Sequence, residues 1–172
     1  MKLVFCVFVF FSSLFVPGYS AQEQQLGEGQ ILNIMMTIDK GEIAAAKEAT
    51  KKKVTPAVDL YAKHLIEQHQ RNLEELIQFA KQEKIEPKES EISNSMVASG
   101  KTDLKALSAL QGKAFDKAFI DAMVTGHQEG LKLIDTKLFP EAKSPQLQMS
   151  LEQFRKMVAA HLEKGLTIQK TL

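Results

Sequence analysis

The sequence holds a carboxylate and three imidazoles whose types and positions suit one shared site: Glu42, His69, His127 and His161. Each stands where an apolar side chain would be expected, in the middle of a helical stripe. Burying these groups without partners would cost several kcal/mol, so they must bond one another, water or an ion. Imidazole and carboxylate together are ligands for zinc, copper, iron or manganese. The residues therefore predict either a metal site or a hydrogen-bonded polar layer that only specifies packing.

The helices predicted to carry these side chains span about 29–53, 56–84, 113–138 and 145 to the C-terminus. Pro56 and Pro145 each follow a hydroxyl residue, which is typical of a helix start. Each of the four polar residues lies about 15 positions or a little less from an end of its helix. With a rise of about 1.5 Å per residue, all four should lie within one or two turns of the same depth.

The direction of each stripe selects the polar residue at its centre. In the first helix the apolar residues surround the direction of Glu42, and Asp39 lies one turn earlier, partly on the same face; these apolar residues are Ile31, Met35, Ile38, Ala45, Ala46 and Ala49. His64 precedes His69 by five residues, which turns it about 140° away on the helix. His64 is therefore predicted to be an ordinary exposed histidine.

The connection from residue 85 to about residue 112 interrupts the helical pattern. Pro87 cannot continue a helix, and the segment 93–101 is polar and contains Gly100. A short helix beginning at Thr102–Asp103 and ending before Gly112 is the only element predicted there. A connection of this length can cross the full length of a bundle. The predicted fold class is all-α, a ferritin-like four-helix bundle with a long connection between helices 2 and 3.

The first 20 residues have the pattern of a secretory signal peptide. Lys2 precedes an apolar run from Leu3 to Val16, and small residues end at Ser20. The predicted domains are a signal peptide at 1–20 and the helical domain at 21–172, in a periplasmic or secreted protein. Removal of the signal would also remove Cys6, the one cysteine, and leave no transmembrane span.

Charge argues against nucleic acid as a partner. The chain carries 22 Lys and Arg against 21 Asp and Glu, a net charge of +1. A nucleic-acid-binding protein would show an excess or a patch of basic residues. The sequence leaves the oligomeric state open.

Several short motifs resemble one bacterial family. They are Glu42-Ile43, Tyr61-Ala62 followed by His69, Phe115-Asp116 followed by His127, and His161-Leu162. In order and spacing they are similar to the ferritin-like family known as domain of unknown function 4142, often labelled a predicted outer-membrane protein. The resemblance covers about residues 28–170. It implies an exported ferritin-like bundle in which the connection between helices 2 and 3 is a crossover, and it implies no established activity.

The polar residues differ from those of di-iron ferritins. Those proteins use a Glu-x-x-His pair on each of two helices together with further glutamates, and no Glu-x-x-His occurs in this sequence. No nucleophile triad or phosphate-binding loop supports an enzyme either. The sequence therefore favours a metal-binding bundle with no catalytic residues assigned, and the alternative is a structural or stress-related interaction bundle.

Overall fold

The computed structural model describes residues 25–172, and the predicted signal peptide lies outside these residues. Within them the chain is helical and has no strands. The helices are α1 (Glu28–Thr50), α2 (Pro56–Glu83), α3 (Glu91–Ser108), α4 (Gly112–Leu133), the π-helical turn η1 (Ile134–Leu138), α5 (Phe139–Glu141) and α6 (Pro145–Gln169). None of the helices in this part of the chain is long and apolar enough to cross a membrane.

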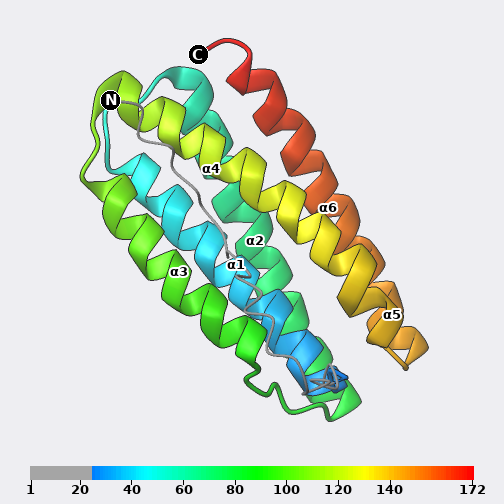
Figure 1. Ribbon diagram of the computed structural model, residues 1–172. Coiled ribbons are helices and arrows are strands. Elements are labelled where there is room, and N and C mark those ends of the chain that lie inside the picture. Colours follow the sequence, from blue (N-terminus) through cyan, green and yellow to red (C-terminus); the bar gives the residue numbers. More distant parts are fainter. Residues whose placement is uncertain (1–24) are drawn as a thin grey trace, which may run out of the picture.

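The long helices lie side by side along one common direction (Figure 1). α1 packs against α2, and α4 packs against α6, while α2 also contacts α6 and α1 also contacts α4. α3 lies along α1 and carries the chain back over the length of the molecule (Figure 1). As a result α2 and α4 run in the same direction, and α1 and α6 run in the opposite one (Figure 1).

The starts of α2 and α6 are where their proline signals predicted them. Pro56 and Pro145 are the first residues of these helices, where a missing N–H costs nothing. The Ser144 side chain accepts a hydrogen bond from the Leu147 N–H, as a helix cap should. The Thr55 side chain makes no such cap bond at the start of α2; there the Thr55 N–H donates to Asp116 of α4 at 3.0 Å, which ties the start of α2 to α4.

The segment between α2 and α4 corrects the prediction of a mostly non-helical connection. α3 begins at Glu91, ten residues before Lys101, where the polar segment was predicted to end. The polar segment with Gly100 is therefore part of the helix. Ser90 caps it, since its Oγ accepts from the Ser93 N–H at 3.1 Å while the Ser93 Oγ accepts from the Ser90 N–H at 2.9 Å. Apolar side chains at Ile92 and Met96 pack on the main core. The run is therefore an amphipathic helix with a narrow apolar face.

The core consists of two apolar clusters at different depths along the helices. One is built on residues 31–36 of α1, 76–80 of α2 and 147–158 of α6. The other is built on residues 46–49 of α1, 58–65 of α2 and 115–124 of α4. Between them each long helix places a buried polar residue; these are Asp39, His69, His127 and His161. The sequence pattern thus produces a polar layer across the middle of the core.

Candidate metal centre

His69 of α2, His127 of α4 and His161 of α6 meet in this layer. One ring nitrogen of each lies within 4.8 Å of the corresponding nitrogens of the other two. The ring centroids are 4.9 Å apart for His69 and His161, 5.4 Å for His127 and His161, and 6.2 Å for His69 and His127. Each of these three histidines is at most 2% exposed. The sequence analysis predicted all three, and the fold brings them together.

The far side of the His69 ring is held by two residues. Its Nδ1 lies 2.8 Å from Oδ1 of Asp39 on α1, and the Asn72 side-chain amide donates to Oδ2 of Asp39 at 2.8 Å. Because a carboxylate can only accept, the His69 proton belongs on Nδ1 and the lone pair on Nε2. That Nε2 is buried and has no hydrogen-bond partner. Metal-binding histidines commonly donate their other ring N–H to a carboxylate in this way, which fixes the tautomer and orientation of the ring.

His127 is oriented by its own helix. Its Nδ1 lies 2.6 Å from the Met123 carbonyl oxygen, one turn earlier in α4. A carbonyl also only accepts, so the proton is again on Nδ1 and the lone pair is on Nε2. This nitrogen is likewise buried without a partner. Two of the three rings therefore have their tautomer fixed so that a lone pair is left over in the polar layer.

The third ring, His161, is held neutral. Its buried Nδ1 has no hydrogen-bond partner. Burial, together with the neighbouring His69 and His127, lowers the pKa of His161 to about 2. The backbone at this position is fixed because the Tyr61 hydroxyl donates to the His161 carbonyl oxygen at 2.9 Å. A neutral imidazole is the form that binds a metal ion.

The donor set fits a metal ion. Each of the three rings has a buried nitrogen with no partner in the protein, and an unpaired, desolvated polar group costs about 1–3 kcal/mol. A cation bound to all three would remove that cost. For ligand atoms no more than 4.8 Å apart, there is a point that lies within about 2.8 Å of all three. Zinc–imidazole bonds are about 2.0–2.1 Å, so a side-chain shift below about 1 Å closes the site.

Glu42, the fourth residue predicted for the site, is not among the three clustered ligands. It is half-buried on α1, one turn after Asp39, and its Oε2 is buried without a hydrogen-bond partner. Burial raises the pKa of Asp39 and of Tyr61, and in both cases the negative charge of Glu42 adds to the effect. Glu42 therefore stands near the layer, while Asp39 occupies the central position on α1.

The central position of Asp39 on α1 could have been predicted from a different set of apolar residues. The fully buried seam of α1 follows a spacing of four and three residues; it comprises Leu32, Met36, Asp39, Ile43 and Ala46. Asp39 is its middle member. The stripe used to select Glu42 included Ile38 and Ala45, which are only half-buried. Those two residues rotated the predicted direction toward Glu42.

The position of His64 corrects the prediction that it is an ordinary exposed histidine. It is half-buried, and its ring meets that of His161 edge-on with centroids 5.4 Å apart. Burial lowers the pKa of His64, and the positive charge of Lys164 adds to this. His161 therefore contacts an imidazole on each side, His64 and His69, both from α2.

The described fold and site define an all-helical protein with a buried cluster of three histidines. The chain belongs to the family described as Domain of unknown function (DUF4142), whose model matches residues 17–168. The family predicted from the sequence motifs is thus confirmed. Neither the curated proteins nor the solved structures contain a match to the chain.

Proposed function

We propose that the protein binds one divalent transition-metal ion through His69, His127 and His161. The observation that carries this proposal is that one ring nitrogen from each of the three histidines lies within 4.8 Å of those of the other two, in a layer where each ring also has a buried nitrogen with no hydrogen-bond partner. Two of the rings have their opposite nitrogen engaged by an acceptor, Asp39 or the Met123 carbonyl. Their lone pairs are therefore available for a ligand.

A polar layer that only specifies packing accounts for these contacts less well. Such a layer would pair each buried donor with a buried acceptor, as Asp39 does with His69 and Asn72. With both Nδ1 protons already used, His69 and His127 have no ring N–H left to offer each other or His161. The single ring N–H of neutral His161 can donate to only one of the two Nε2 acceptors of His69 and His127. A buried acceptor is then left over, which a cation would stabilise and packing alone does not.

We propose Glu42 as the carboxylate ligand that completes the site. Support comes from its place one turn after Asp39 and from its buried, unpartnered Oε2. Three imidazoles and one carboxylate make a tetrahedral set suited to zinc or copper, and also within the range of iron and manganese. When Glu42 is withdrawn, three protein ligands leave one position for water, as in catalytic zinc sites. No residue is assigned a catalytic role.

We also propose that the fold is a ferritin-like four-helix bundle in an exported protein. Support for the bundle comes from α3, which returns the chain so that α2 and α4 run in the same direction (Figure 1). In a ferritin-like bundle one long crossover has this effect, and cofactors are held in the core by side chains of facing helices. Support for export comes from the signal-peptide pattern of residues 1–20.

The test is metal content measured together with thermal unfolding. Purified protein should retain close to one metal ion per chain, and zinc added to chelator-treated protein should raise its melting temperature. His69→Ala should abolish both effects, and His127→Gln should do the same if the first variant folds poorly. Gln70→Ala, at the exposed neighbour of His69, should behave as wild type. Wild-type protein that binds no ion and melts identically with and without zinc would establish the packing layer instead.

A further inference from the structure

The three clustered histidines are almost completely enclosed, so an ion must reach them from water through the helices. His69 has no exposed surface, and His127 and His161 expose no more than 2%. The seam between α2 and α6 is where another metal-ligating side chain stands, because His64 of α2 contacts His161 of α6 there. His64 is half-buried. One side of its surroundings is therefore solvent and the other is the buried cluster.

The imidazoles along this seam form a continuous series. The His64 and His161 rings meet at 82° with centroids 5.4 Å apart, and the His161 and His69 rings follow at 4.9 Å. His161 thus lies between a partly exposed histidine and a fully buried one. An ion held by His64 is one ligand exchange from His161, and His161 already belongs to the cluster.

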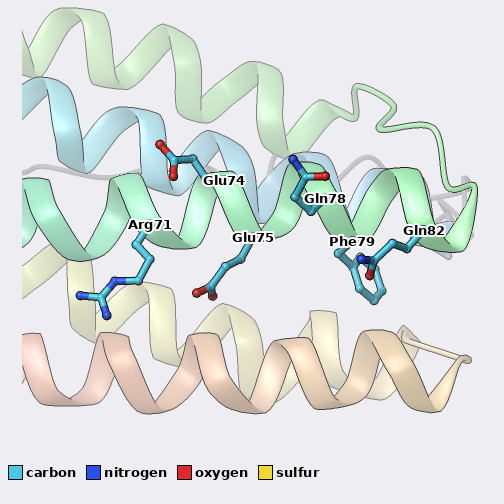
Figure 2. Close-up of a pocket in the computed structure, with 6 residues that line it drawn as sticks. All are labelled: Arg71, Glu74, Glu75, Gln78, Phe79 and Gln82. Carbon is cyan, nitrogen blue, oxygen red and sulfur yellow. The ribbon is translucent and has the colours of Figure 1, made fainter.

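Two grooves lie further along α2, beyond His64. One helical turn further along α2, a groove of about 200 Å³ begins, lined by Gln68, Arg71, Asn72 and Glu75 of α2 and by Gln153 and Met157 of α6. A larger groove of about 620 Å³ follows on the same face of α2. In Figure 2 the side chains of Arg71, Glu75 and Phe79 extend from α2 toward the α6 ribbon. The lining is mostly polar, as a path for a hydrated ion requires.

We propose that His64 is the access ligand through which a divalent metal ion reaches the buried histidines. This inference rests on the proposed metal site. The hydrated ion first exchanges one bound water for a ring nitrogen of His64. The bond to His64 then breaks as a bond to His161 forms, and His69 and His127 replace further waters. No electron is transferred, and the released waters return through the groove.

The rate of metal uptake tests this proposal. Cobalt(II) is mixed with metal-free protein in a stopped-flow instrument, and its visible absorption reports binding to the enclosed ligands. His64→Ala should slow uptake about tenfold, within the one to three decades over which association rates vary among variants of one site. The stoichiometry should remain one ion per chain. Gln70→Ala, at an exposed position of α2 outside the lining of either groove, removes a side chain of similar size without an imidazole and should leave the rate within about twofold.

The sign of the effect separates the alternatives. If His64 only blocks the seam, truncation speeds uptake, and if it only packs against His161, uptake is unchanged; either result overturns the proposal. An equal slowing in Gln70→Ala also overturns it, because the effect would then come from disturbing α2. A wild-type protein that binds no cobalt refutes the metal site itself, so the two failures are distinguishable.

A second variant tests whether the ion passes close to His64 at all. The positive charge of Lys164 acts on both His64 and His161. An approaching cation on this path should therefore feel Lys164 as a barrier, and Lys164→Gln should speed uptake at low salt and less so at high salt. An uptake rate in Lys164→Gln that equals the wild-type rate at every salt concentration would place the path elsewhere.

Discussion

Asp39→Asn offers the sharpest test of how the site is built, because it changes a side chain that supports a ligand. Asp39 is completely buried and lies 2.8 Å from His69 Nδ1 and 2.8 Å from the Asn72 amide. Asparagine keeps the shape and can still accept from His69, but it lacks the charge that makes the imidazole a stronger ligand. Loss of a carboxylate that accepts a hydrogen bond from a metal-binding histidine typically costs about 10- to 100-fold in metal affinity. That range corresponds to about 1.4–2.7 kcal/mol.

The metal-free protein should respond differently to the same substitution. Burial raises the pKa of Asp39, which means that the fold disfavours its charged form. Asparagine removes that penalty, and Asn72 can rotate its amide to meet the new side chain. The free energy of unfolding without metal should therefore change by no more than about 1 kcal/mol. We therefore expect Asp39→Asn to lower the free energy of unfolding strongly when metal is present and to change it little when metal is absent.

Urea unfolding with and without zinc measures both quantities. At a free zinc concentration about 100-fold above its dissociation constant, wild-type protein should gain about 2.7 kcal/mol. Asp39→Asn at the same zinc concentration should gain only about 0.4–1.4 kcal/mol. Asp135→Asn changes an exposed aspartate that pairs with Arg155 and should keep the full zinc effect. If Asp39→Asn retains the wild-type gain, the charge of Asp39 does not strengthen His69 as a metal ligand.

Three further predictions concern the helices around the site. A Cβ at Gly165 would lie 3.1 Å from the Tyr61 hydroxyl, so Gly165→Ala should lose about 1–3 kcal/mol in urea unfolding. A Cβ at Gly41 would meet nothing within 4 Å, so Gly41→Ala should instead raise the free energy of unfolding by up to about 1 kcal/mol. Equal effects of the two substitutions would contradict the close packing at Gly165. Asp116→Ala removes the acceptor for the N–H at the α2 cap and should lose about 1–3 kcal/mol in the same assay; an unchanged midpoint would show that the bond contributes nothing. Burial and the adjacent imidazoles lower the pKa of His161, so in the metal-free protein this residue takes up a proton more readily when the chain is unfolded. The free energy of unfolding should therefore keep the full contribution of His161 above pH 6.5 and fall by up to about 1.4 kcal/mol per pH unit below it. His161→Gln should make the free energy of unfolding depend less steeply on pH. If wild type and His161→Gln show the same pH dependence between pH 7 and pH 5, the prediction is wrong.

The helical class and most helix ends were predictable from local signals. Proline after a hydroxyl residue placed the starts of α2 and α6 at Pro56 and Pro145. α3 was not predicted in full because its apolar face is narrow and its interior includes Gly100. It is stabilised instead by the Ser90–Ser93 cap and by packing on α1. Tertiary contacts of this kind override a weak local propensity.

The three histidines of the candidate site were predictable because each replaces an apolar residue at the centre of a regular stripe. The carboxylate was harder to assign, since Asp39 and Glu42 lie one turn apart and the small alanines of α1 do not define its buried direction sharply. The contact of His64 could not be predicted from α2 alone. His64 and His69 do point in different directions, but the His161 ring of α6 is in contact with both.

The candidate ligands come from three helices, and they are 58 and 34 residues apart in sequence, as their numbers 69, 127 and 161 show. No short segment of the unfolded chain can therefore chelate an ion in the way that two histidines on one helical turn can. The full set exists only after α6 has docked, so metal cannot nucleate folding. An ion bound there would leave the refolding rate of the chain unchanged and would slow its unfolding. Metal would then act on the lifetime of the folded protein and not on the speed at which it forms.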